Sequence, residues 1–109
     1  MTILRKSARG QSCTIRRANC RWQPEYTVLA HENGAGIGLK HSDIRAAFAC
    51  DKCHSEYDQR TPENAAEIER DFYRGVMETL QYWMDNGYIS IQRPPKSLVS
   101  NFEEVESWQ

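Results

Sequence analysis

The sequence predicts a small α+β domain that is stabilised by zinc and carries an added amphipathic helix towards its C-terminus. Three observations lead to this prediction: four cysteines in two pairs, a segment rich in aromatic and β-branched residues, and a later run with an apolar residue at every fourth position. The 109 residues fit one domain, which we assign to residues 1–93, followed by an acidic tail over residues 94–109. The core of so short a chain is modest, so a bound metal would contribute much of its stability.

The sequence also predicts a cytoplasmic protein without a membrane segment. No apolar run is long enough to cross a bilayer, and residues 1–6 lack the apolar stretch of a signal peptide. Because cytoplasmic thiols stay reduced, the four cysteines favour metal binding over disulfide bonds.

The two cysteine pairs predict one structural zinc ion. Cys50 and Cys53 are separated by two residues, so their thiolates can hold one side of a tetrahedral ion, and Cys13 and Cys20 can supply the other two ligands. The gap between Cys13 and Cys20 is wider than the usual zinc-finger spacing but fits a looped knuckle. Buried free thiols are the simpler alternative for this pair. A thiol oxidoreductase site at Cys50 and Cys53 is disfavoured, because no thioredoxin-like βαβ pattern precedes it.

The first half of the chain predicts short elements. Residues 1–12 form an arm or a short turn of helix, and residues 26–31 form a strand. Residues 32–38 form a glycine-rich loop, which is not a phosphate loop because no Gly-Lys-Ser/Thr follows. A short capped helix is expected over residues 44–48. A further helix is expected to begin at Cys53.

A long amphipathic helix dominates the second half. Thr61 can cap it, Pro62 suits its first position, and Asn86-Gly87 ends it. Alternating residues then predict a strand over residues 88–93. The apolar positions of the helix lie four residues apart and form a face for the core or for a homodimer interface: Ile68, Phe72, Val76, Leu80 and Met84.

The distribution of charge predicts a nucleic-acid binder, although the net charge of −1 does not. The chain up to Arg21 contains six basic residues and no acid. A one-sided basic segment is the usual electrostatic footprint of nucleic-acid binding, and here it surrounds the predicted zinc knuckle. A solvated terminus is the alternative. We expect contacts with DNA from Arg5, Lys6, Arg9, Arg16 and Arg17.

Three further residues predict metal-assisted phosphodiester hydrolysis. His54 and Asp58 lie four residues apart, so on a helix they share one face and could hold one divalent ion, Mg²⁺, Mn²⁺ or Zn²⁺. His31 ends the predicted strand and could take a proton from the attacking water. Each residue also has a simpler interpretation. His31 could be an ordinary residue at a strand edge, His54 could cap a helix or bind the structural zinc, and Asp58 could pair with Arg60.

The order of these motifs resembles the HNH endonucleases. It runs from the first cysteine pair through Ala30-His31 and a glycine-containing loop to Ala49-Cys50-x-x-Cys53-His54-x-x-x-Asp58. Together with Leu4-Arg5-Lys6-x-Ala8-Arg9-Gly10-x-x-Cys13 and Val28-Leu29-Ala30-His31, it is more closely similar to the small nucleases of lambdoid phages and prophages of the YbcO type. The resemblance implies a zinc-stabilised HNH-like, treble-clef ββα-metal core. It also implies a DNA endonuclease of phage or prophage origin, active in recombination or replication.

The sequence departs from the broad HNH pattern at three places. Ala30 occupies a position where many such enzymes have a metal-binding Asp or His, and Asp58 stands where the last metal ligand is often His. The asparagine that orients the base is not evident, although Asp43 lies near its place. The competing function is a non-enzymatic zinc knuckle that binds nucleic acid, which would need none of His31, His54 and Asp58.

Overall fold

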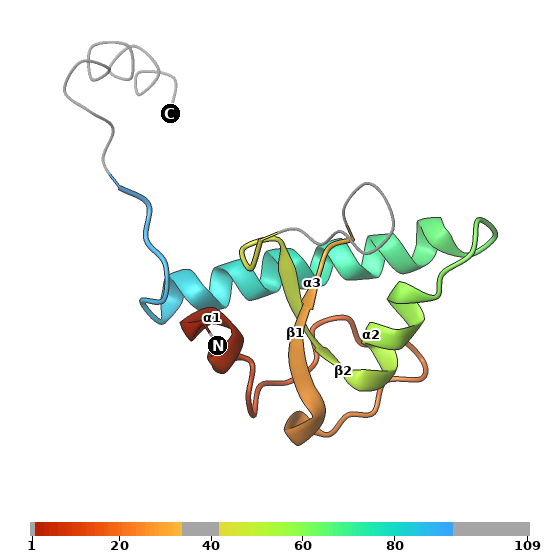
Figure 1. The fold of residues 1–109 in the computed structure, drawn as a ribbon, viewed down its shortest axis with the longest axis horizontal. Coiled ribbons are helices and arrows are strands. Elements are labelled where there is room, and N and C mark those ends of the chain that lie inside the picture. Colours follow the sequence, from red (N-terminus) through yellow and green to blue (C-terminus); the bar gives the residue numbers. More distant parts are fainter. Residues whose placement is uncertain (1, 34–41, 93–109) are drawn as a thin grey trace, which may run out of the picture.

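A computed structural model describes residues 2–33 and 42–92 (Figure 1). Its elements follow in the order α1 (Ile3–Ser7), the 3-10 turn η1 (Pro24–Tyr26), β1 (Thr27–His31), β2 (Ala46–Cys50), α2 (Asp51–Asp58) and α3 (Ala65–Asp85). These elements confirm the α+β class. Most of the predicted glycine-rich loop and the whole predicted tail lie outside the described residues. None of the described helices is long and apolar enough to span a membrane.

The two strands form one antiparallel hairpin. The register pairs Thr27 with Cys50 at one end and His31 with Ala46 at the other. Figure 1 shows α3 crossing behind the hairpin. Helix α1 lies near the C-terminal end of α3, and α2 lies near the N-terminal end of α3. The hairpin therefore carries Cys50, a candidate zinc ligand, at one end and His31, a candidate catalytic residue, at the other.

The helix predicted over residues 44–48 is wrong, because β2 occupies residues 46–50. All five residues of β2 are buried, since β1 pairs with its edge and α3 packs across it. The backbone N–H of Phe48 donates to Thr79 Oγ1 on α3 at 2.9 Å. Alanines favour a helix locally, but at Ala46, Ala47 and Ala49 their small side chains let a helix lie close against a strand.

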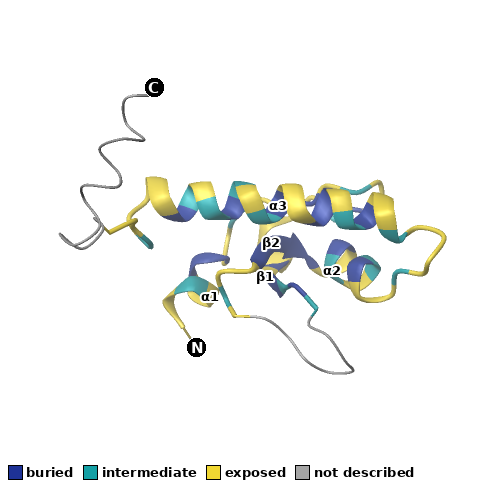
Figure 2. Ribbon diagram, turned by 90° about the horizontal axis from the view of Figure 1, so that it is seen from above, coloured by how far each residue is buried: buried dark blue, intermediate teal, exposed yellow. Residues whose placement is uncertain are grey.

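The long helix α3 confirms the predicted amphipathic pattern, and its inner face belongs to the core. Met84 is the exception in the predicted face: it is 42% exposed, and its neighbour Trp83 is buried instead. Figure 2 shows its buried positions on the side turned towards the strands. Gly75 permits the closest approach, since a Cβ there would lie 2.6 Å from Thr14 Oγ1 and 3.3 Å from the Ala47 Cβ. Glycine at this position therefore lets the helix contact both β2 and the loop between Cys13 and Cys20.

The buried side chains form two clusters, one on each side of the hairpin. One surrounds the cysteines and includes Tyr57 stacked on Phe72, with ring centroids 3.9 Å apart. The other centres on Trp83, which meets Phe48 edge to face and donates from Nε1 to Ser7 Oγ at 2.7 Å. The second contact attaches α1 to the C-terminal half of α3.

The two ends of α3 differ from the prediction in detail. The helix begins at Ala65 rather than Pro62, after a turn in which Asn64 Oδ1 accepts from the Thr61 N–H at 2.7 Å. The strand predicted over residues 88–93 is wrong for its described part, since residues 88–92 contain no strand. The backbone N–H groups of Tyr88 and Ile89 instead bond the Trp83 carbonyl and close the end of the helix.

Candidate functional site

The four cysteines meet in one buried cluster that could hold a metal ion. Their sulfur atoms all lie within 4.8 Å of one another, and Cys20 Sγ and Cys50 Sγ are 3.8 Å apart. Four sulfurs at the usual zinc–sulfur bond length form a tetrahedron with edges of about 3.8 Å. The cluster therefore fits a tetrahedral ion, as the sequence predicted.

Hydrogen bonds and burial shift the pKa values of the cysteines in the cluster in different directions. The backbone N–H groups of Arg21 and Cys53 donate to Cys50 Sγ at 3.3 and 3.4 Å. The Cys53 thiol donates to Cys13, which lowers the pKa of Cys13 to about 4 and raises that of Cys53. Burial raises the pKa of Cys20 to about 11. Four sulfurs this close cannot all lose their protons unless a cation joins them.

A residue of the cysteine cluster also marks where α2 begins. Cys50 ends β2 and is the N-cap of α2, because its sulfur accepts the N–H of Cys53. The next residue, His54, therefore leaves the first turn of α2 in a direction different from that of Cys53. Cys53 is buried, whereas the side chain of His54 is 31% exposed.

The second component is a contact between His31 and Asp43. His31 is the last residue of β1, and its Nε2 lies 2.6 Å from Asp43 Oδ1. Asp43 also accepts from Thr2 Oγ1 at 2.5 Å and from Arg5 Nε at 3.2 Å. These donors lower the pKa of Asp43 from 3.8 to about 2, with Thr2 contributing most and His31 next. Asp43 is therefore a carboxylate at neutral pH.

The third component is the pair His54 and Asp58 on α2. His54 Nε2 and Asp58 Oδ2 are 3.2 Å apart, one helical turn from each other. Two adjacent ligands of an octahedral Mg²⁺ ion lie about 3 Å apart, so both atoms fit one such ion. Asn33, two residues beyond β1, donates from Nδ2 to Asp58 Oδ1 at 3.4 Å and from its backbone to Tyr57. Ala30, fully buried, supplies no ligand.

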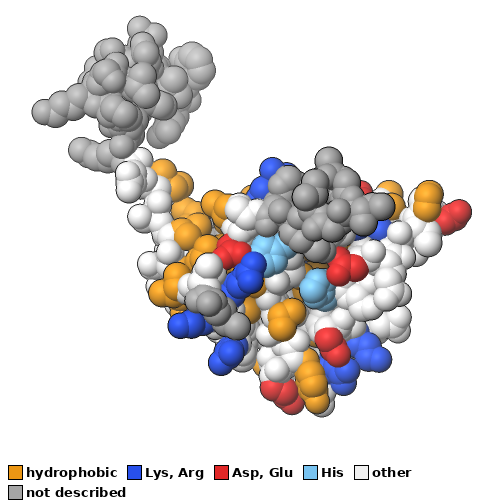
Figure 3. All heavy atoms as spheres, in the orientation of Figure 1, with side chains coloured by type: hydrophobic (Ala, Val, Ile, Leu, Met, Phe, Trp, Pro, Cys, Tyr) orange, Lys and Arg blue, Asp and Glu red, His pale blue; other side chains and the backbone are white. Residues whose placement is uncertain are grey.

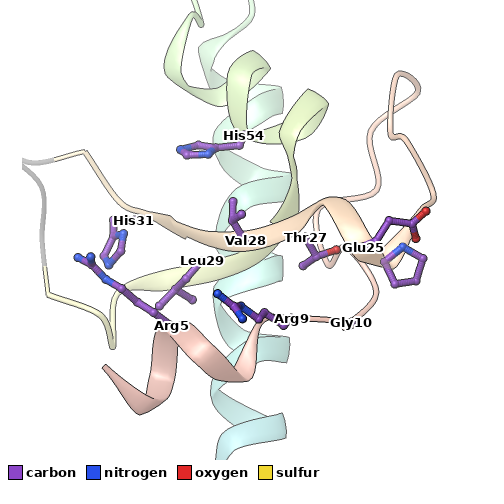
Figure 4. A pocket seen from close by; sticks show the side chains of 10 residues that line it. Arg5, Arg9, Gly10, Glu25, Thr27, Val28, Leu29, His31 and His54 are labelled. Atoms are coloured by element: carbon purple, nitrogen blue, oxygen red, sulfur yellow. The ribbon is translucent and has the colours of Figure 1, made fainter. Parts of the chain in front are cut away.

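One surface groove receives both histidines. It has a volume of about 900 Å³, and Figure 4 shows its lining, which runs along β1 from His31 past Val28 to Glu25, with His54 above the strand and Arg9 below it. In the space-filling view both described histidines lie on one face of the molecule, with basic side chains close by (Figure 3). The groove is the feature that brings together candidates from β1, α2 and the N-terminal segment.

The basic residues divide into two groups. Arg17 donates to Asp71 at 2.7 Å and pairs with Glu56 and Glu67, which raises its pKa, and only 14% of its side chain is exposed. Arg16 forms two hydrogen bonds with Glu78. Arg5, Lys6 and Arg9 are exposed, and Arg5 and Arg9 line the groove. Arg16 and Arg17 therefore join the loop between Cys13 and Cys20 to α3, whereas Arg5, Lys6 and Arg9 face solvent.

The chain was compared with known families. The family described as "Putative nuclease YbcO" matches residues 2–88. The chain belongs to this family. Two curated YbcO relatives, one from Escherichia coli strain K12 and one from Enterobacteria phage 82, are each 37% identical over 94 residues. Each match covers 82% of this chain and 98% of the relative.

One solved structure has a fold similar to that of this chain. It is described as the structure of a putative bacteriophage protein from Escherichia coli K-12 MG1655, and it is 36% identical. The TM-score is 0.65, and the match covers 78% of this chain and all of the other. The matched family is that of nucleases at the putative level, which agrees with the resemblance noted from the motifs.

Sequence reasoning missed two residues of the site. Asp43 was noted only by its position, and the missing signal was its contact with His31, which depends on how the hairpin closes. Asn33 was treated as a loop residue, although it follows the strand by two positions and reaches Asp58. The one indication in the sequence is that Asn33 is a polar residue two positions after His31.

Proposed function

We propose that this YbcO protein is a metal-dependent DNA endonuclease with an HNH-like ββα-metal core. In this proposal it acts in the cytoplasm of a bacterial host, as a phage or prophage enzyme. The observation that carries the proposal is one groove lined by a histidine held by a carboxylate and by a second histidine with its own carboxylate.

His31 is the general base in this proposal. Asp43 is ionised and can only accept, so the 2.6 Å contact requires a proton on His31 Nε2. The neutral ring then carries its lone pair on Nδ1, which is the atom that would take the proton from water. Asp43 acts as a positioning residue, because it fixes both the tautomer and the direction of the ring.

His54 and Asp58 are the proposed ligands of the catalytic divalent ion, Mg²⁺, Mn²⁺ or Zn²⁺. Such an ion, when bound, would polarise the phosphate and neutralise charge on the leaving oxygen. Two protein ligands suffice for Mg²⁺, which usually keeps water and substrate phosphate in its remaining positions. Asn33 holds Asp58 in place by its hydrogen bond. The cysteine cluster binds a structural zinc in this proposal, and it fixes the start of the helix that carries His54.

DNA would reach the groove along its basic side. Arg5 and Arg9 line the groove and Lys6 lies on the same short helix as Arg5, so these three are the proposed phosphate contacts. Arg16 and Arg17 are less suited to this role, because carboxylates hold both terminal nitrogens of each guanidinium group, whereas Arg5 bonds Asp43 through Nε.

The proposal is tested by nicking of supercoiled plasmid with Mg²⁺ or Mn²⁺. His31→Ala should reduce nicking roughly 100- to 10,000-fold, the usual effect of a positioned base, while zinc content and DNA affinity stay unchanged. Added imidazole should restore part of the activity. His54→Ala should lose both nicking and Mn²⁺ binding. Asp85→Asn, which changes an exposed carboxylate outside the groove, is the matched control and should nick normally.

Two results would reject the proposal. If His31→Ala nicks as fast as the parent protein, His31 is not the base. If the parent protein binds DNA but shows no metal-dependent nicking of supercoiled, linear or branched DNA, the chain is a zinc-knuckle binding module instead.

A further inference from the structure

Trp22 is a large aromatic side chain held out into solvent. It is 65% exposed, and its backbone φ of 60° lies in the left-handed region, which bulky residues rarely adopt. The preceding residue, Arg21, donates its backbone N–H to Cys50 Sγ, so the metal cluster fixes the chain at this point. Within the described residues the indole ring makes no stacking contact. The ring therefore lies outside the two core clusters, and most of the residue is accessible to solvent.

Tyr26 is a second exposed aromatic residue near the same end of the knuckle. It is 44% exposed, and the Arg21 guanidinium lies over its ring at 4.2 Å from the centroid. Arg21 in turn makes two hydrogen bonds of 2.7 Å to Asp51 at the start of α2. Because Asp51 holds the guanidinium, the contact with Arg21 orients the tyrosine ring before any ligand arrives, and the residue remains partly exposed.

The segment that carries these two aromatic residues leads into the groove, whose lining includes Pro24, two residues after Trp22. Tyr26 belongs to η1, which leads directly into β1, and Val28, two residues later, is 46% exposed and lines the groove. Figure 4 shows the groove running from His31 and His54 past Val28 towards Glu25 in η1. A strand of DNA whose phosphate lies at the histidines would thus extend its neighbouring nucleotides towards η1.

Charge at the two ends of the groove differs in a way that favours different parts of a nucleotide. Arg5 lies beside His31 at the reactive end and Arg9 lies below the middle of the strand, and both can attract phosphates there. At the aromatic end Glu25 lines the groove, and the charge of Arg21 is compensated by Asp51. This end therefore offers phosphates little attraction but offers neutral bases two rings.

We propose that Trp22 and Tyr26 form a stacking surface for unpaired bases, so that the preferred substrate is DNA with a single-stranded segment beside the scissile phosphate. This inference rests on the proposed nuclease function and names its substrate class. Exposed rings bind the faces of bases, and in a continuous duplex those faces are already stacked on each other. Splayed or flapped DNA exposes the faces of its unpaired bases and still carries the phosphates that the basic residues would contact.

The test is fluorescence anisotropy with three oligonucleotide substrates of matched sequence: a duplex, a splayed fork and a single strand. Binding is measured on the zinc-loaded His31→Ala chain without added Mg²⁺ or Mn²⁺, so that no cleavage occurs. The fork should bind more tightly than the duplex. Trp22→Ala should weaken fork binding on the order of 5- to 150-fold, the effect expected for one stacked base, and leave duplex binding nearly unchanged.

Two further variants separate stacking from general effects. Trp22→Phe keeps an aromatic ring and should retain most of the preference for the fork. Met77→Ala removes a side chain of equal exposure on α3, outside the groove, and should change neither affinity. Zinc content and far-ultraviolet circular dichroism confirm that each variant is folded.

The outcomes distinguish this inference from the nuclease proposal. The stacking surface is overturned if the parent chain binds fork and duplex with equal affinity, or if Trp22→Ala lowers both affinities equally. Either result stands even if the parent protein nicks DNA. A preference for the fork that depends on Trp22 supports the stacking surface even if no DNA is cut, in which case the nuclease proposal alone fails.

Discussion

The Gly75→Ala substitution tests how α3 is packed against the rest of the domain. The added Cβ would lie 2.6 Å from Thr14 Oγ1 and 3.3 Å from Ile15 Cγ1. Thr14 cannot easily move, because its hydroxyl and its backbone N–H both donate to the Phe48 carbonyl at 2.8 Å. The substitution therefore overpacks the core between α3 and Thr14, and it also breaks the buried hydrogen bond of the Thr14 hydroxyl.

The magnitude follows from three opposing effects. Replacing glycine by alanine within a helix stabilises it by about 1 kcal/mol. Overpacking a dense core costs about 1–3 kcal/mol, and loss of the buried Thr14 hydrogen bond costs about 1–3 kcal/mol more. We expect Gly75→Ala to lower the free energy of unfolding by about 3 kcal/mol, which for a domain of this size lowers Tm by at least ~10 °C.

The assay is urea unfolding at fixed free zinc, followed by the fluorescence of buried Trp83. Gln81 lies at an exposed position of the same helix. The difference in the free energy of unfolding between Gln81→Ala and Gln81→Gly therefore measures the intrinsic helix preference of alanine over glycine. Thr14→Ala should cost stability in the parent protein but little or none in Gly75→Ala, because it removes the overlapping hydroxyl. A Gly75→Ala protein more stable than its parent, or additive effects of the two substitutions, would refute this account of the packing.

Three other perturbations have defined outcomes. Cys53→Ser should reduce zinc below one ion per chain, measured by atomic absorption, and unfold much of the protein; a folded, zinc-free and active variant would contradict the structural role. Because the pKa of Asp43 is lowered from 3.8 to about 2, the stability that this group provides at neutral pH is lost as the pH falls from 3.8 through 2. The unfolding free energy of Asp43→Asn should therefore depend less on pH in this range, and an unchanged dependence would rule out the predicted ion contacts. Replacing Lys6 and Arg9 together by alanine should reduce the slope of log affinity against log salt by about 1.8, as expected for two lost phosphate contacts, whereas an unchanged slope would place the DNA elsewhere.

The parts of the fold that follow local rules could be predicted from the sequence. The apolar spacing from Ile68 onwards predicted α3, and the β-branched and aromatic residues before His31 predicted β1 within one residue. The cysteine cluster was predicted because the chemistry of four thiols in a small chain leaves few alternatives. In each case the pattern that predicts the feature lies within a short stretch of sequence, or in the preference of cysteine thiols for zinc.

The errors arose where tertiary packing decided the outcome. Three of residues 46–50 are alanine, which favours a helix, yet the segment forms β2 because β1 lies on one side of it and α3 on the other. Residues 88–92 alternate as a strand does, but no described strand lies beside them, and their first amide groups close α3 instead. The contact between His31 and Asp43 was not predictable, since it depends on closure of a hairpin across twelve positions.

The cysteine cluster has a consequence for how the molecule opens. Cys20 and Cys50 are 30 positions apart, so an ion shared between them closes a chain loop that contains β1, His31 and Asp43. A covalent cross-link of this span would stabilise a domain by roughly 3–4 kcal/mol through the lost freedom of the unfolded chain, and a tightly held ion acts in the same way. The C-terminal turns of α3 lie outside that loop. In hydrogen exchange these turns should therefore exchange first, while the hairpin that carries His31 stays closed until the ion is released.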